Sequence, residues 1–513
     1  MDNNKNKAVG LWKSLSAFIL GMRLSKFFFL LATISWGKCF LLFFLVAMLV
    51  PSYQRPGYYP DSLMYETMAN NLLAGAGLSL STAPPYQPTM AKEPLYPTVI
   101  ALFKAVFGDN IDGLVLLQIL VNPLIAILVY LIGNRLFDGK VARLSALLVA
   151  LIPIYGDISF SVMPESFFVV LFLSTILLLL AVENTASPRG FLLAGALLGL
   201  SSLFKNVVLP LAVLYPAVLI LKHRESLNRR MAMNVILFLL SFSLVTTPWM
   251  LRNKHQLGLF SISVRGGSYF SHQASWAAHF TMEEWKAYSL YLLSGRLAQK
   301  LYPQVIGSDL GEYEYAVLMR YAYVGRLQQK HKEGEVERIL VQEGIQNVLR
   351  HPLKFLALSL LVELQTLKYF VPGSLMFLKG PAGAEWLFPS TRFLLLLMGI
   401  LFTFLTVRGM LYCKGRLSSC SLILVTVAYF HIASASLGVV PNAIQRYILP
   451  VTVFYSFFIV IALLGRSWEE KGRAEGSNLT DFCSPRTIGS AHASAIHPAR
   501  NSVHGMEVSS FIG

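Results

Sequence analysis

The chain has 513 residues, of which 55% are hydrophobic and 14% are charged. Soluble proteins carry about 25% charged residues, so the composition excludes an ordinary cytosolic protein and, for most of the chain, disorder. The 43 basic and 27 acidic residues give a formal net charge of +16. The composition predicts an all-α polytopic membrane protein, whose excess charge lies in loops and does not indicate nucleic-acid binding.

Spanning helices need about 20 mostly apolar residues, and such stretches predict about ten spans, within a range of roughly 9 to 13. One long apolar run is interrupted by Lys205, Asn206 and Pro210, which divide it into a helical hairpin. The expected spans are 27–50, 113–134, 141–155, 165–183, 190–205, 207–221, 233–250, 391–407, 420–437 and 447–465.

Five regions are expected along the chain. They are a cytoplasmic or interfacial arm at 1–30, an N-terminal transmembrane module at 31–250, a polar interfacial region at 251–390, C-terminal transmembrane helices at 391–465 and a disordered tail at 466–513.

Two polar regions interrupt the apolar pattern. Residues 51–112 are rich in Tyr, Pro and Gly, with helix-like stretches at 61–74 and 94–107. The region 251–390 has amphipathic stretches and one apolar piece at 353–371. Because that piece contains Glu363, Gln365 and Lys368, we expect it to lie at the membrane interface, with a true span as the alternative.

The loop charges predict an orientation. With the N-terminus in the cytoplasm, most basic loop residues fall on the inner side, as the positive-inside rule requires. We therefore expect a multi-pass protein of the inner (plasma) membrane with both termini cytoplasmic. Both polar regions then lie on the outer face, where an enzyme needs ordered chain and a simple channel does not.

Charged residues near the outer ends of the expected spans are the candidates for chemistry. Asp61 opens a helix, where a carboxylate either acts on a substrate or only complements the helix dipole. Lys92 precedes a helix beginning near Pro94, and it could meet an anion or snorkel to lipid phosphates. Asp157 and Glu165 share a short outer loop, and carboxylates so close to the apolar slab usually have a functional reason.

Two arginines complete this set. Arg252 follows Pro248-Trp249 at the outer end of a span, and Arg446 opens the last span. Trp and Arg at these positions are also ordinary membrane-interface residues.

The order of these motifs resembles that of GT-C membrane glycosyltransferases. The motifs are Tyr59-Pro60-Asp61-Ser62 with Ala69-Asn70-Asn71-Leu72, Lys92-Glu93-Pro94-Leu95-Tyr96-Pro97, Leu198-Gly199-Leu200 through Phe204-Lys205, Pro248-Trp249 to Arg252-Asn253, and Arg446-Tyr447. The nearest branch, similar to glycosyltransferase family 39, holds bacterial relatives of protein O-mannosyltransferases and the lipid A aminoarabinose transferase. The resemblance covers roughly residues 30–465.

The resemblance implies a function. Such enzymes move a sugar, with inversion, from a polyprenyl-phosphate donor to a lipid, glycan or protein acceptor on the outer face. It implies that Asp61 is the catalytic base, and that Lys92, Arg252 and Arg446 bind the donor phosphate. In some members a second-loop acid helps to hold a divalent metal ion, so no cofactor is certain and a metal on Asp157 or Glu165 stays open. The rival hypothesis, favoured by the break at Lys205, is a transporter or flippase of lipid-linked sugars.

Overall fold

The structure is a computed structural model. It describes residues 60–150, 155, 159–183, 185, 187–226, 228–293, 295–308, 321–369, 388–437 and 441–465. These residues form helices and no strand, with one isolated bridge between Ser79 and Pro88, which confirms the all-α prediction for them. The expected arm at 1–30, the span at 27–50 and the tail at 466–513 lie outside the described residues.

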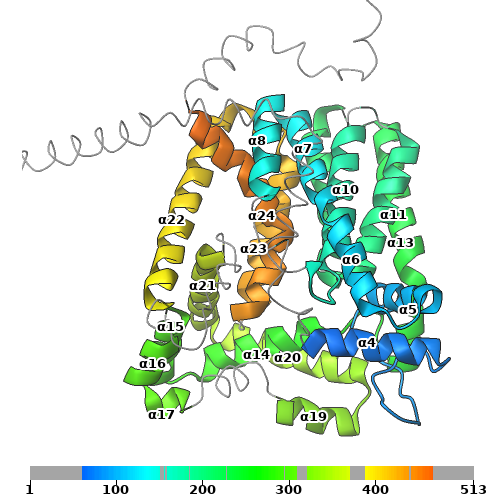
Figure 1. Cartoon of the computed structure of the whole chain (residues 1–513), viewed down its shortest axis with the longest axis vertical. Coiled ribbons are helices and arrows are strands. Elements are labelled where there is room, and N and C mark those ends of the chain that lie inside the picture. The colour runs from blue at the N-terminus through cyan, green and yellow to red at the C-terminus, as the bar shows by residue number, and fades with distance from the viewer. Residues whose placement is uncertain are drawn as a thin grey trace, which may run out of the picture. The chain divides into compact units, whose positions relative to one another are not determined.

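Apart from the span at 27–50, each expected span contains an apolar helix (Figure 1). They are α6 (Ile111–Val121), α7 (Pro123–Leu136), α8 (Gly139–Ala150), α10 (Glu165–Val182), α11 (Pro188–Phe204), α12 (Leu211–Lys222), α13 (Arg229–Leu257), α22 (Phe388–Tyr412), α23 (Ser421–Leu437) and α24 (Pro441–Leu464).

Among the described residues, four stretches are long and apolar enough to cross a membrane. They are Ile111–Leu136, Glu165–Val182, Arg229–Leu257 and Tyr447–Leu464. Five shorter apolar stretches in the described part of the chain follow the same pattern, among them Leu397–Tyr412 within α22; in α12 prolines limit the length, because Pro210 precedes the helix and Pro216 lies inside it. The chain is an integral membrane protein, and the total of about ten spans stays a prediction.

Helices α11 and α13 pack closely because two glycines of α11 face α13. A Cβ atom on Gly195 would lie 2.1 Å from the carbonyl oxygen of Phe238, and one on Gly199 would lie 2.8 Å from Cβ of Val245. Small residues at such contacts let two membrane helices approach backbone to backbone. The position of α13 relative to α11 is therefore set by the lack of side chains at these two residues.

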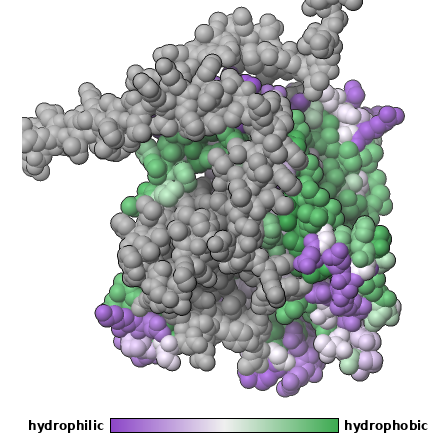
Figure 2. Space-filling view, in the orientation of Figure 1, coloured by the Kyte–Doolittle hydropathy of each residue, from purple (hydrophilic) through white to green (hydrophobic). Residues whose placement is uncertain are grey.

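A second set of helices belongs to the two polar regions. The first region forms α4 (Pro60–Leu73) and α5 (Leu95–Phe107). The second forms α14 (Arg265–His279), α15 (Met282–Leu293), α16 (Gly295–Leu301), α17 (Pro303–Ile306), α19 (Tyr321–Lys330), α20 (Glu333–Arg350) and α21 (Pro352–Tyr369). In Figure 1, α4, α14 and α20 run across the ends of the upright helices. Figure 2 shows hydrophobic side chains along the flank of α11 and α13, and hydrophilic ones near α19.

Candidate functional site

Helix α4 begins and ends where its sequence provides the means. Pro60 fits the first helical turn, whose N–H groups need no helical partner. Gly75, with φ of 76°, takes the left-handed conformation that commonly follows a helix end. Asn71 then donates from Nδ2 to the carbonyl oxygens of Ser79 (2.8 Å) and Ser81 (3.0 Å), which holds the loop after the helix. This loop returns the chain to the start of α4.

Asp61 and Lys92 form an ion pair at this place. Lys92 Nζ lies 2.6 Å from Asp61 Oδ1, and their side chains are 3% and 18% exposed. Lys92 Nζ also lies 4.8 Å from the centre of the Tyr65 ring, within the range of a cation–π interaction. The structure thus brings together two of the sequence-predicted residues, which are 31 positions apart in the chain.

The aromatic residues beside the pair connect it to the second outer loop. Tyr65 meets Tyr96 edge to face, with 5.0 Å between ring centres. The Tyr96 hydroxyl donates to Oε1 of Gln118 (2.6 Å), and Gln118 Nε2 donates to the carbonyl oxygens of Ser159 and Ser161. These side chains are buried, so this network is rigid and sets the orientation of Tyr65 under the ammonium group.

Two further residues hold the chain just before Lys92. Glu333, at the start of α20, accepts hydrogen bonds from the Thr89 hydroxyl (2.6 Å) and the Met90 N–H (2.8 Å). Arg252 donates from Nη1 to the Thr89 carbonyl oxygen (3.0 Å) and stacks over the Trp249 ring at 4.6 Å. The predicted residue Arg252 therefore reaches the Lys92 loop, three residues from Lys92 itself. Glu333 could not be recognised from the sequence as a residue of this site, because acidic residues are common at the start of a helix.

Glu93 connects three distant segments. Its Oε1 atom accepts from the backbone N–H of Asn206 (3.3 Å) and from the Ser263 hydroxyl (3.0 Å). Lys92 directly precedes Glu93, and Lys205 directly precedes Asn206. The two lysines therefore belong to the same neighbourhood.

Glu165 forms an ion pair with Lys205. Lys205 Nζ lies 2.9 Å from Glu165 Oε1, with side chains 12% and 1% exposed. α11 ends at Phe204, so Lys205 occupies the break in the apolar hairpin. Lys205 was predicted to interrupt the apolar run but was not among the predicted site residues, although a charge inside an apolar run is itself a signal of a functional site.

Two predicted residues cannot be placed at the site. Asp157 lies outside the described residues, and Arg446 lies on α24 with its side chain outside the described part of the chain. Within the described residues, no group of three His, Cys, Asp or Glu side chains could hold a metal ion. Beside Glu165 the described residues supply the ammonium group of Lys205, and a metal ion on Asp157 or Glu165 stays a prediction.

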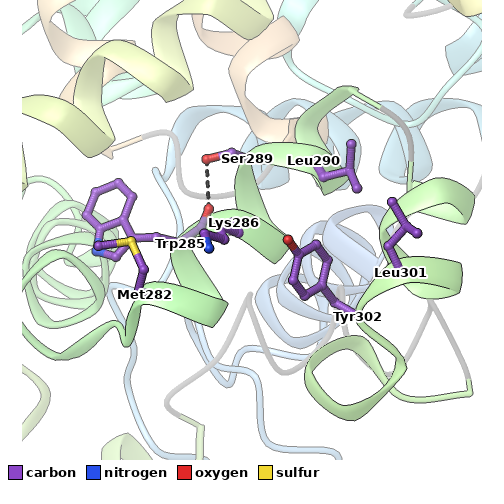
Figure 3. A pocket seen from close by; sticks show the side chains of 7 residues that line it. All are labelled: Met282, Trp285, Lys286, Ser289, Leu290, Leu301 and Tyr302. Atoms are coloured by element: carbon purple, nitrogen blue, oxygen red, sulfur yellow. Dashed lines mark hydrogen bonds between the residues drawn. The ribbon is translucent and has the colours of Figure 1, made fainter.

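An open hollow of about 520 Å³ lies apart from these residues, on α15 to α17 (Figure 3). Its lining is mainly apolar and aromatic and includes no carboxylate; it consists of Met282, Trp285, Lys286, Ser289, Leu290, Leu301 and Tyr302. Because the hollow offers no carboxylate that could act as a base, we take the ion pairs as the candidate active site.

Comparison with known proteins gives one match in sequence. The model of the family described as dolichyl-phosphate-mannose-protein mannosyltransferase matches residues 87–250. No curated protein matches the chain. The predicted resemblance to GT-C membrane glycosyltransferases is confirmed over this segment, which includes Lys92, Glu165 and Lys205 but not Asp61 or Arg252.

Two solved structures are similar to the chain at low identity. The apo oligosaccharyltransferase of Archaeoglobus fulgidus is 14% identical with a TM-score of 0.46; the match covers 86% of this chain and 52% of the other. The chain thus spans about half the length of that protein. ArnT from Cupriavidus metallidurans bound to undecaprenyl phosphate is 14% identical with a TM-score of 0.36, over 88% and 80% of the two chains.

Proposed function

We propose that the protein transfers a sugar, with inversion, from a polyprenyl-phosphate donor to a lipid, glycan or protein acceptor on the outer face of the inner membrane. The ion pair between Asp61 and Lys92 (2.6 Å) carries this proposal, because it joins a base and a cation at one place. The family match over residues 87–250 supports the donor class, since that family is named for a polyprenyl-phosphate-linked sugar.

The proposed step needs one base and one or more cations. The acceptor hydroxyl oxygen attacks the anomeric carbon while its proton passes to the Asp61 carboxylate. The bond from the anomeric carbon to the phosphate oxygen breaks on the opposite side, and its electron pair stays with the leaving polyprenyl phosphate. The ammonium of Lys92 stabilises this negative charge.

Donor binding would rearrange the ion pair. A donor phosphate competes with Asp61 for Lys92, so binding of the donor frees the carboxylate for the acceptor proton. Arg252 is the second proposed cation, because its guanidinium reaches the same loop at Thr89 and has five N–H donors. Arg446 is the third, on its place at the start of the last span.

A substitution on α4 has a matched control. We expect Asp61→Asn to lower transfer by about 10² to 10⁴-fold, the usual contribution of a general base. Glu66→Gln is the control, because Glu66 lies on the same helix, is similarly exposed (22%) and also pairs with a lysine, Lys104, at 2.8 Å. We expect it to keep transfer within a few-fold.

The assay is complementation of cells that lack the gene. Mass spectrometry of envelope glycolipids and glycoproteins identifies the sugar that disappears, and each variant is scored by its return at equal protein level. Full return with Asp61→Asn would contradict the proposed base. Movement of labelled undecaprenyl-phosphate-linked sugar across liposomes with no covalent product would favour the flippase instead.

A further inference from the structure

Helix α21 exposes leucines along one face. Their exposed fractions are 79% for Leu353, 54% for Leu356, 58% for Leu360 and 57% for Leu364. The spacing of three, four and four residues puts all four on one side of a helix. A contiguous apolar face of this kind on a protein surface marks contact with a lipid or another protein.

The other face of α21 meets the protein and is mixed, because it buries Leu358 and Val362 together with polar side chains. Gln273 Nε2 of α14 donates to the Ser359 hydroxyl oxygen (3.0 Å). The Ser434 hydroxyl of α23 donates to Glu363 Oε2 (3.0 Å), and His431 Nδ1 also contacts the Glu363 carboxylate. A helix exposed to water carries polar side chains on its outer face, whereas α21 carries leucines there and directs Ser359 and Glu363 inward.

The polar contacts also give the depth that α21 reaches. Glu363 lies level with His431, which is six residues before Leu437 at the end of α23. At 1.5 Å per residue, Glu363 is about 9 Å inside the end of that helix. A carboxylate at this depth in a bilayer is expected to face the bundle and to be paired, as Glu363 is with His431.

The leucine face continues a second apolar stripe. α21 packs against α22, whose exposed hydrophobic residues recur at helical spacing: Leu397 (46%), Ile400 (49%), Leu401 (52%), Phe404 (50%), Val407 (51%) and Leu411 (68%). α22 fills an expected span, so this stripe faces acyl chains. The neighbouring face of α21 has the same chemistry.

The first turns of α21 carry the marks of a membrane–water boundary. Lys354 Nζ lies 3.5 Å from the carbonyl oxygen of Ala278 in α14. α15, which also packs against α21, contributes Trp285 and Lys286 to the hollow of Figure 3. Tryptophan and lysine are typical of the bilayer interface, where one end of the side chain is apolar and the other is hydrated.

We propose that α21 is inserted among the lipid acyl chains beside α22 and α23, with its leucine face as the lipid contact. Leu353 lies nearest the water boundary and Leu364 lies deepest. The orientation predicted from loop charge puts this contact in the outer leaflet. The sequence predicted a helix at the interface for 353–371, with a true span as the alternative; the proposed insertion makes the bilayer the partner of this face.

Spin labels on single cysteines test the proposal. The full chain, with its four native cysteines replaced by alanine, receives Leu356→Cys, Leu360→Cys or Leu364→Cys and is reconstituted in liposomes. Collision with oxygen reports lipid, and collision with a water-soluble nickel chelate reports water. We expect the oxygen-to-nickel ratio to rise several-fold from position 356 to 364.

Three controls fix the scale. Leu401→Cys on α22 reports lipid, Glu335→Cys on the exposed side of α20 reports water, and Ser359→Cys reports the protein-facing side with low collision with both reagents. Ready collision of the leucine positions with nickel would overturn the proposal in favour of a water-facing surface. Low collision with both reagents would overturn it in favour of coverage by protein. The readout needs no sugar transfer and is independent of the proposed function.

Discussion

Helix α4 makes two ion pairs with lysines that follow it, and their surroundings differ. At its first turn, Asp61 meets Lys92, which lies over the Tyr65 ring. Near its middle, Glu66 meets Lys104, which also contacts Asp109 (2.7 Å) and the Asn70 amide oxygen (3.0 Å).

The difference distinguishes Lys104, a cation with a structural role, from Lys92, a cation that could exchange its carboxylate partner for a phosphate. Burial alone would lower the pKa of Lys104, but the hydrogen bonds and charges of Asp109 and Glu66 raise it above its ordinary value. Two carboxylates thus keep Lys104 charged, and its ion pairs link α4 to the end of α5. Lys92 instead sits on the loop that Glu333 and Arg252 hold in place, where a phosphate would find a second cation.

The largest effect should come from replacing the two lysines in turn. We expect Lys92→Met to lower transfer by about 10² to 10³-fold, the usual cost of one group that stabilises developing charge. Lys104→Met should leave transfer per folded molecule nearly unchanged and lower stability by about 1 to 3 kcal/mol, because it leaves Glu66 and Asn70 without their partner. Transfer and the thermal unfolding midpoint, measured on the same preparations, separate the two.

The conservative variant guards against a merely structural role of Lys92. Lys92→Arg keeps a cation and should recover part of the lost transfer. If Lys92→Met and Lys104→Met lost stability and transfer in the same proportion, the distinction between the two ends of α4 would be wrong.

A smaller effect, on stability, is expected for the pair between Glu165 and Lys205. Glu165→Gln removes a charged partner of the nearly buried Lys205 ammonium group, which should cost about 3 kcal/mol. Glu165→Gln combined with Lys205→Met removes both charges and should recover much of this loss. Unfolding midpoints in detergent measure both variants. A double variant no more stable than the single one would show that the pair does not act as a unit.

The smallest effect concerns a carboxylate held by backbone N–H groups. Burial raises the pKa of Glu337 to about 7, against hydrogen bonds from the backbone of Gly267 and Ser268 that lower it. The folded state therefore binds the Glu337 proton more tightly than the unfolded state, whose pKa is about 4.5. Stability should fall as the pH rises from about 4.5 to about 7, and then stay level.

Glu337→Gln cannot ionise and should lack this loss. The unfolding midpoint of the variant minus that of the wild type should increase between pH 5 and pH 8. Glu283→Gln, at an exposed position in the first turn of α15, is the control and should show no such trend. A constant difference across this range would contradict the assignment of the proton to Glu337.

Much of the helical pattern could be predicted from the sequence, because long apolar stretches have one simple solution in a bilayer. The expected helix at 61–74 is observed as α4, and that at 94–107 as α5. α8 (139–150) covers the described part of the helix that was expected at 141–155, apart from Tyr155.

The site was partly predictable for a different reason. Asp61 and Lys92 could be predicted because each lies at the start of an expected helix, within motifs that resemble those of GT-C glycosyltransferases, and the structure pairs them. Their contact with each other, and the roles of Glu333 and Glu93 in holding the Lys92 loop, depend on long-range packing that leaves no local pattern. Glu333, for example, is 244 positions from Thr89, whose hydroxyl it binds.

The glycines between α11 and α13 have a consequence for charge. Lys205 directly follows α11, and Arg252 belongs to α13. Gly195 and Gly199 fix how closely these two helices lie, so they also fix the distance between the two positive groups that the helices carry. The absence of side chains at Gly195 and Gly199 thus influences the electrostatic potential at the membrane surface, because it sets how far apart these two helices lie.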